Sequence, residues 1–431
     1  MDTLWQKHSA PAEFPKLAGD IRTDVLVIGG GMAGLLTAYC LQQKGIQTVL
    51  VEKDRLCSGT TAGTTAKITA QTGLIYHKIL KSSGSEQARM YYQANTQAVR
   101  DLKELCVRAG CDLENKDNYV YSADPRKLEG ELTALQQIGV RAIFKKRLPL
   151  PVTPAGAVGF ADQGQFDPLQ LAGFLAKNLT VYENTRVTEM IGTTAVTDRG
   201  RIAAQKVVVA THFPFLNKHG SYFLKLYQHR SYMLALTGAP RLEAMYVDDD
   251  KKGHSFSSFG DYLLLGGGGH RTGKQGGSYP ELLAFREEHY PQARVAFQWA
   301  AQDTMSLDGI PYIGHYSAKT PELYVAAGFN KWGMTGSMVS ARLLSEMIAG
   351  KTPDWAPVFS PSRSMLKPQL LCNGVEATVN LLWPTTRRCP HLGCALKYNK
   401  EEHSWDCACH GSRFAEDGRV LNNPANADLK K

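Results

Sequence analysis

Several features are missing from this chain of 431 residues, and each absence excludes a class of protein. No apolar run reaches the roughly 18 residues that a membrane-spanning helix needs, and the first 24 residues lack the apolar centre of a secretion signal. Lys and Arg form no stripe with interleaved aromatics, although the formal net charge is +9, so we expect no nucleic-acid partner. A cytoplasmic protein without a transmembrane segment is therefore predicted.

The composition that remains is that of a globular protein. Hydrophobic residues make up 43% and charged residues 21%, which is typical of folded domains in water. The chain is too long for one ordinary core, so two or three lobes are expected. We find no internal repeat. The modest basic excess suits an anionic substrate or cofactor.

A β–α–β unit is predicted near the N-terminus. Residues 24–30 (DVLVIGG) are apolar and β-branched, as in a buried strand. Residues 31–44 have the helical period up to Gly45, and residues 47–52 (QTVLVE) indicate a second buried strand. This order is the opening of a doubly wound parallel sheet.

The turn of this unit has the pattern of a dinucleotide site. Gly29, Gly31 and Gly34 fit G-x-G-x-x-G, and Glu52 ends the second strand. The first glycine permits a tight turn, the second lets the backbone approach a pyrophosphate, and the third lets helix and strand pack closely. The helix N-terminus favours phosphate, and the acid can bind ribose hydroxyls. FAD and NAD both remain open on these residues alone.

The rest of the chain alternates helices and strands. Helices are predicted near 85–109, 126–138 and 335–349, and another begins at Asp167-Pro168, an N-cap followed by a first-turn proline. Residues 206–211 predict a further buried strand, and residues 222–270 suggest an antiparallel sheet in a second lobe. Residues 351–370 hold four prolines and little periodicity, which indicates a linker or a strap.

The cysteines point to metal. Five of the nine lie in the last 60 residues, which without an export signal favours a metal site over a disulfide framework. Cys389 and His391 form C-x-H, and Cys407 and His410 form C-x-x-H, so two facing loops can supply four ligands. Two thiolates suit one iron of a two-iron, two-sulfur (2Fe–2S) cluster and two imidazoles the other. A Cys₂His₂ zinc site is the alternative.

The first 350 residues resemble a known flavoprotein superfamily. The segments LAGDIRTDVLVIGGGMAGLLTAY, CSGTTAGTTAKIT and DGIPYIG…LYVAAGFNKWGMTGSM are similar to the glycine oxidase/D-amino-acid dehydrogenase superfamily, closest to the γ-glutamylputrescine oxidoreductase-like group. The resemblance implies FAD, and the loop from Cys57 to Thr69 has no His that could hold it covalently. It further implies FAD contacts at Ser58, Thr60, Thr61, Thr65, Val187, Gly328, Gly333, Met334 and Thr335.

The C-terminus resembles the Rieske family. CPHLGC and CACHGSRF match its two loops, which implies a 2Fe–2S cluster on the four ligands and a disulfide between Cys394 and Cys409. Ser412 would tune the cluster through a hydrogen bond. Cys389 follows Cys372 by only 17 positions, which leaves less chain before the first loop than the family usually has, so the cluster or the flavin lobe must supply stability.

The expected fold is α/β, with a Rossmann-like FAD-binding domain, an antiparallel-sheet substrate lobe and a small all-β Rieske-type domain. The oxidoreductase part would span 1–350, with FAD-binding parts at about 20–80, 180–215 and 305–350 and the substrate lobe at about 85–180 and 220–300. The linker would be 351–370 and the Rieske domain 371–431.

The expected function is oxidation of an amine or amino acid, with electrons passing singly from flavin to cluster and on to an external carrier or quinone. No motif names a catalytic base. His270, Arg271 and Lys331 are weak candidates, as are Tyr232 and Trp332. A redox-sensing or electron-transfer flavoprotein without substrate turnover is the alternative, and so is a flavoprotein with structural zinc.

Overall fold

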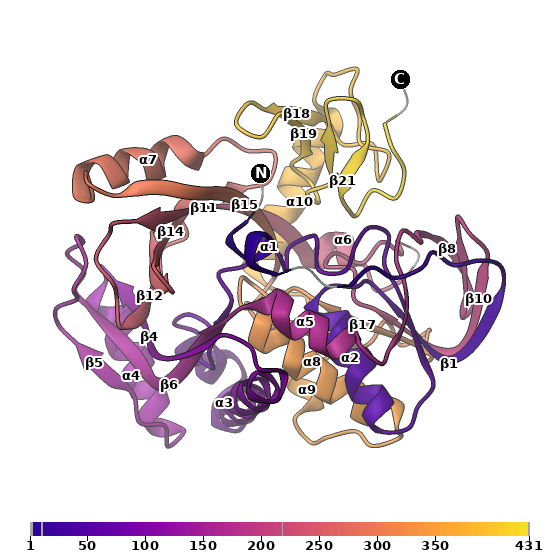
Figure 1. Cartoon of the computed structure of the whole chain (residues 1–431), viewed down its shortest axis with the longest axis horizontal. Coiled ribbons are helices and arrows are strands. Elements are labelled where there is room, and N and C mark those ends of the chain that lie inside the picture. The colour runs from indigo at the N-terminus through magenta and orange to yellow at the C-terminus, as the bar shows by residue number, and fades with distance from the viewer. Residues whose placement is uncertain (1–2, 10–11, 218, 430–431) are drawn as a thin grey trace.

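The computed structural model describes residues 3–9, 12–217 and 219–429. Two large lobes lie side by side, and a small C-terminal domain lies against both (Figure 1). The first lobe is built on a sheet of order β16-β17-β10-β1-β2-β7, in which β1, β2, β7, β10 and β17 are parallel. Its strands are β1 (Ile21–Ile28), β2 (Thr48–Val51), β7 (Thr180–Tyr182), β8 (Val187–Ile191), β9 (Thr194–Thr197), β10 (Arg201–Val209), β16 (Tyr312–His315) and β17 (Leu323–Ala327).

Helices α2 and α8 pack on this sheet, whereas α3 and α4 contact strands of the second lobe. Helix α2 packs against α5 and α8, and α3 packs against α4 and α8. Asp167 caps α5 by accepting the N–H groups of Leu169 and Gln170, as the N-cap pattern predicted. The predicted helix at 85–109 is the second part of a longer α3, which breaks at Gly84 with φ +85°. The bounds are α1 (Leu4–His8), α2 (Met32–Gln43), α3 (Tyr76–Ala109), α4 (Pro125–Gln137), α5 (Pro168–Ala176) and α8 (Gly333–Ile348).

The second lobe is a nine-stranded sheet of order β15-β11-β14-β13-β12-β4-β6-β3, with β5 paired to β6. Pairing is antiparallel except between β12 and β4, which run parallel. Its elements are β3 (Lys67–Ile68), β4 (Leu113–Ser122), β5 (Ile143–Lys145), β6 (Gly156–Phe166), α6 (Tyr222–Lys225), β11 (Leu226–Thr237), β12 (Ala244–Asp248), β13 (Ser255–Phe259), β14 (Tyr262–Arg271), α7 (Ser278–His289) and β15 (Arg294–Ser306).

The residues that build each lobe differ from the expected ranges. Helix α5 packs on α2, and β7 pairs with β2, so residues 168–182 belong to the first lobe. β3 lies in the second sheet. The chain therefore crosses between the lobes at positions that hydrophobic periodicity does not mark.

Residues 351–367 form a strap that is fixed to the first lobe. Helix α9 (Ala356–Phe359) buries Val358 and Phe359, and the guanidinium of Arg363 donates two 2.8 Å hydrogen bonds to the Asp308 carboxylate. Helix α10 (Pro368–Leu382) follows and runs across the expected boundary at 370/371. No helix was expected there.

The C-terminal domain is a four-stranded antiparallel sheet of order β18-β19-β20-β21. Its strands are β18 (Leu396–Asn399), β19 (Ser404–Cys407), β20 (Arg413–Ala415) and β21 (Val420–Asn422). The predicted fold class is confirmed: a mixed α/β fold with a parallel sheet carries a separate small all-β domain. In the described part of the chain, no helix has both the length and the apolar character needed to cross a bilayer.

Candidate functional sites

The glycine turn between β1 and α2 has the shape that its sequence predicts. Gly29 has φ +110°, and a Cβ there would lie 2.5 Å from the Ala210 carbonyl oxygen. A Cβ on Gly34 would lie 1.9 Å from the Gly29 oxygen, so only glycine lets helix and turn touch. At Gly31 the one atom within 4 Å of a Cβ would be Thr61 Oγ1, at 3.4 Å. Gly31 therefore faces open space, where a phosphate can approach the backbone.

Glu52 lies at the same turn, directly after β2. Its carboxylate accepts the N–H of Gly30 at 2.7 Å and the N–H of Asp54 at 2.9 Å. Burial raises the pKa of Glu52, while these backbone hydrogen bonds oppose the shift. Glu52 also lines the cavity that begins at this turn.

A cavity of about 1400 Å³ extends from this turn between the two lobes. Ten of the thirteen expected FAD contacts line it: Gly29, Gly31, Glu52, Ser58, Thr60, Thr61, Thr65, Val187, Gly333 and Met334. The other three residues do not line the cavity and instead make contacts within the protein. Gly34 packs inside the turn, Gly328 packs on Leu226, and Thr335 accepts the Thr69 N–H. The N-terminus of α8 opens on the cavity, so its dipole can stabilise negative charge there.

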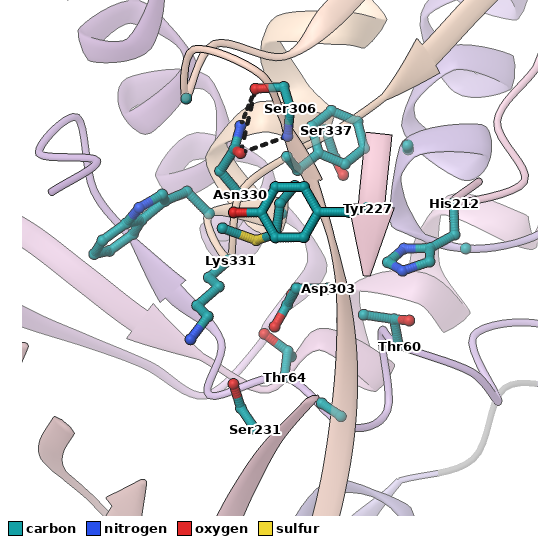
Figure 2. A pocket seen from close by; sticks show the side chains of 18 of the residues that line it. Thr60, Thr64, His212, Tyr227, Ser231, Asp303, Ser306, Asn330, Lys331 and Ser337 are labelled. Carbon is teal, nitrogen blue, oxygen red and sulfur yellow. Dashed lines mark hydrogen bonds between the residues drawn. The ribbon is translucent and has the colours of Figure 1, made fainter. Parts of the chain in front are cut away.

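Lys331 and Asp303 bring opposite charges into the cavity (Figure 2). Lys331 projects into the open space, and the protein around it lowers its pKa through desolvation. Burial raises the pKa of Asp303, and the nearby Lys331 opposes that shift. Asn330 holds the turn before Lys331: its Oδ1 accepts the Ser306 N–H at 2.8 Å. Both Asn330 and Lys331 have positive φ, at +53° and +72°, a backbone geometry that costs energy and is common at functional sites.

Trp332 also lines the cavity, but the other three catalytic candidates lie elsewhere. His270 Nε2 lies 3.1 Å from the Tyr232 hydroxyl, which in turn donates to Glu402 of the C-terminal domain. Arg271 donates to the carbonyl oxygens of Ala408 and Cys409, each at 3.1 Å. None of His270, Arg271 and Tyr232 lines the cavity, because their part of the sheet is covered by the C-terminal domain. They hold that domain and do not reach a substrate in this cavity.

The two C-terminal loops share one backbone pattern. The N–H of Gly393 donates to the Cys389 oxygen and that of Gly411 to the Cys407 oxygen, both at 2.9 Å. The glycines have φ of +78° and +82°, which favours glycine four residues after each leading cysteine. The N–H groups of Cys389 and Cys407 are also bonded within their own loops. The two loops thus share a backbone turn, although the histidine is the third residue of the first loop and the fourth residue of the second.

The four expected ligands come together there. The Cys389 and Cys407 thiols are buried, and the His391 and His410 ring centroids lie 4.9 Å apart. Nδ1 of each ring has no hydrogen-bond partner. His391 Nε2 is paired with Asn217 Oδ1 at 2.8 Å, which orients the ring. Burial lowers the pKa of His391 to about 4 and that of His410 to about 3, so both are neutral ligands at pH 7.

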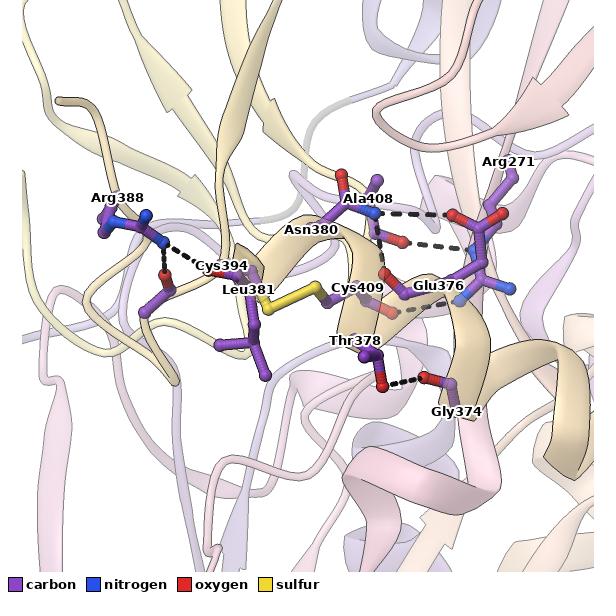
Figure 3. The surroundings of a disulfide bond; sticks show 11 residues. Arg271, Gly374, Glu376, Thr378, Asn380, Leu381, Arg388, Cys394, Ala408 and Cys409 are labelled. Carbon is purple, nitrogen blue, oxygen red and sulfur yellow. Dashed lines mark hydrogen bonds between the residues drawn. A yellow bond between two sulfur atoms is a disulfide. The ribbon is translucent and has the colours of Figure 1, made fainter. Parts of the chain in front are cut away.

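Beside them, Cys394 and Cys409 form the expected disulfide (Figure 3). The Cys407 sulfur lies within 4.8 Å of both disulfide sulfurs. Ser412 is buried next to the Cys389 thiol, whose pKa its hydroxyl helps to lower. The unpartnered Nδ1 atoms, the paired thiols and the bracing disulfide fit a 2Fe–2S cluster. A zinc site would leave the disulfide and Ser412 without a role.

Buried polar contacts hold the C-terminal domain against both lobes, and no sequence motif predicts these contacts. Arg230 and Arg413 both bind the Glu402 carboxylate. Gln302 Nε2 donates to the Gly411 oxygen at 2.8 Å, directly beside His410. Asn423 Nδ2 donates to the oxygens of Thr211 and Phe213. These residues lie singly in strands and loops far apart in the sequence, so spacing gave no signal for them.

One short segment separates the cavity from the cluster ligands. Thr211 and His212 line the cavity, and the adjacent Phe213 ring meets the His410 ring edge-on, with centroids 6.3 Å apart. On a second route, Tyr227 lines the cavity and Arg271 stacks on its ring at 4.9 Å. Arg271 then reaches the Cys409 oxygen.

Fold and sites together define a flavoprotein with a second, iron–sulfur redox centre. Residues 24–347 match the family model described as FAD dependent oxidoreductase, and residues 381–431 match the Rieske [2Fe-2S] domain. The chain belongs to the FAD-dependent oxidoreductase family and ends in a Rieske domain. FAD and a 2Fe–2S cluster are accordingly its cofactors.

Three relatives illustrate this kinship. The putative Rieske 2Fe-2S iron-sulfur protein YhfW of Bacillus subtilis is 31% identical, over 100% of this chain and 97% of that protein. Gamma-glutamylputrescine oxidoreductase of Escherichia coli is 24% identical, over 79% of this chain and 86% of that one. Glycine oxidase from Geobacillus kaustophilus superposes with a TM-score of 0.66 and 22% identity, covering 80% and 99% of the two chains, which shows the common fold.

Proposed function

We propose that the protein oxidises the CH–NH group of a small amine or amino acid and passes the electrons singly to the cluster. The single observation that carries this proposal is the segment Thr211–Phe213, which touches the cavity on one side and the His410 ring on the other. Relatives named glycine oxidase and gamma-glutamylputrescine oxidoreductase support the substrate class. An external carrier or a quinone would take the electrons onward.

The cofactors would supply the redox chemistry, and the residues of the chain would hold and orient them. Bound FAD supplies a hydride acceptor, and the cluster supplies a one-electron centre. Gly29, Gly31 and Glu52 would hold the dinucleotide, and the two ligand loops would hold the irons. The α8 N-terminus would favour negative charge on the reduced cofactor.

Lys331 and Asp303 suit the two ends of an amino acid. The Lys331 ammonium would bind a substrate carboxylate, and the Asp303 carboxylate would bind the amino group, so that the substrate carbon is oriented within the cavity. Lys331 is exposed to the cavity and Asp303 is partly exposed, so both charges are open to a bound substrate. Neither residue needs to act as a base, because a neutral amine can lose hydride unaided.

Replacing Lys331 by alanine is expected to raise KM for the substrate by about 10- to 100-fold, which corresponds to the roughly 1.5–3 kcal/mol of a charge-assisted hydrogen bond. The measurement is anaerobic bleaching of the flavin band across a panel of amines and amino acids, first with the wild type and then with Lys331→Ala. Lys331→Arg keeps the cation and should recover part of the affinity. A wild type that no amine bleaches would contradict the proposed activity, and equal KM values in all three proteins would contradict the role of Lys331.

A further inference from the structure

Exposed apolar side chains are concentrated at one place on the described surface. Of the twelve large hydrophobic residues that are exposed there, eight lie between residues 366 and 392. They are Leu366, Leu371, Val375, Val379, Leu381, Leu382, Trp383 and Leu392. All belong to helix α10 or to the segments that flank it, and we call them the α10 patch. An apolar patch of this kind marks an interaction surface.

Helix α10 is amphipathic, but its apolar face is exposed and its polar face is buried. Leu371, Val375 and Leu382 are 74%, 55% and 78% exposed, and their spacing of four and seven places them on one stripe. The opposite face is polar and buried: Asn373 accepts from Arg271 at 3.0 Å and donates to the Leu224 oxygen at 3.1 Å. Figure 3 shows Arg271 and Glu376 gathered on one side of this helix. The helix therefore binds its own protein with its polar face and leaves its apolar face to another environment.

Positive charge surrounds the patch. Between residues 364 and 397 the cations are Lys367, Arg387, Arg388 and Lys397, and the one acid is Glu376. Glu376 is neutralised by Lys274 at 2.6 Å. Arg387 and Arg388 are exposed at the C-terminal end of the helix, beside the half-exposed Trp383. Aliphatic side chains with a tryptophan at one end and flanking cations are the composition of helices that lie in a bilayer interface.

We propose that the α10 patch binds the surface of an anionic lipid bilayer. The apolar stripe would enter the boundary between headgroups and acyl chains, and the flanking cations would meet anionic headgroups. A second copy of this chain fits less well, because an isologous contact through α10 would set this positive rim against itself. A bilayer offers the opposite charge.

The position of the patch adds a consequence, which rests on the proposed function. The exposed Leu392 follows the ligand His391 directly, and Arg388 joins the end of α10 to this ligand loop through the oxygens of Leu381 and Gly393. Docking of the patch would therefore bring the His391 side of the cluster to the lipid surface. A hydrophobic carrier dissolved in the bilayer could then accept the electrons.

Sedimentation with lipid vesicles tests the docking without any substrate. Full-length holoprotein is mixed with vesicles of phosphatidylcholine alone or with one third phosphatidylglycerol, at low and high salt. We expect the wild type to bind the anionic vesicles, to release partly at high salt, and to bind neutral vesicles weakly. The double variant Leu371→Glu/Val375→Glu should lose about tenfold or more of this binding.

The control is Val107→Glu, since Val107 is 73% exposed on α3, away from the patch. It should bind vesicles as the wild type does, and unchanged flavin and iron content would show that every variant is folded. Equal vesicle binding by Leu371→Glu/Val375→Glu and the wild type would overturn the proposal. A wild type that does not bind anionic vesicles would also overturn it. A wild-type dimer that Leu371→Glu/Val375→Glu converts to monomer would assign the patch to a second copy instead. Because binding is measured without turnover, failure here is distinct from failure of the proposed oxidation.

Discussion

Replacement of Cys407 by serine is expected to abolish the iron–sulfur cluster and leave the flavin lobe folded. Cys407 is buried beside Cys389 and is the first residue of the second ligand loop. A serine oxygen is a poorer ligand for iron than a thiolate. The C-terminal sheet has only four short strands, so loss of the cluster should also remove much of that domain's stability. The flavin cavity is formed mainly by the two large lobes and should keep its cofactor.

Iron content, the electron paramagnetic resonance spectrum of the reduced protein, and the flavin absorption measure this outcome. Cys372→Ser is the matched control, because Cys372 is exposed on α10 and outside the ligand loops. It should retain full iron and the full signal. Iron and signal that survive in Cys407→Ser would show that the cluster is held by other residues.

Replacement of Gly31 by valine is expected to expel FAD without unfolding the protein. The Gly31 backbone has φ −77°, which any residue can adopt, and a Cβ there meets only Thr61 at 3.4 Å. The added side chain would instead fill the space in which the pyrophosphate approaches the turn. Overpacking of about 3 kcal/mol would weaken FAD binding by about 100-fold or more.

Flavin content after purification and the circular dichroism spectrum test this expectation together. Gly130→Val is a suitable control, because a Cβ at Gly130 in α4 would meet nothing within 4 Å. The control should remain yellow. If Gly31→Val bound FAD normally, the turn would not be the pyrophosphate site. Loss of the fold as well would show that the space beside Gly31 cannot hold a larger side chain.

Local signals in the sequence were sufficient to predict the backbone turns that line the candidate cofactor sites. The strand, glycine turn and helix at 21–43 depend on contacts between near neighbours. The same is true of the two ligand loops, each of which has a glycine four residues after its leading cysteine. Each of these has a fixed spacing because one cofactor must meet several backbone groups of the same short segment.

The features that sequence reasoning missed depend on distant contacts. Helix α10 was not predicted, because residues from 371 onward were assigned to the all-β domain, although Leu371, Val375 and Leu382 follow the helical period. Arg271 was considered for a substrate, yet its partners are Ala408 and Cys409, more than 130 residues away. Asp303 became a candidate only when β15 placed it beside Lys331. No motif in the sequence encodes such contacts between distant residues.

The central claim is that electrons from the cavity reach the cluster. The most direct measurement adds a substrate that bleaches the flavin band to anaerobic holoprotein and records the electron paramagnetic resonance spectrum. The account predicts that the signal of the reduced cluster appears as the flavin band is lost, and that it is absent in Cys407→Ser. Flavin that bleaches while the iron stays oxidised would contradict the account.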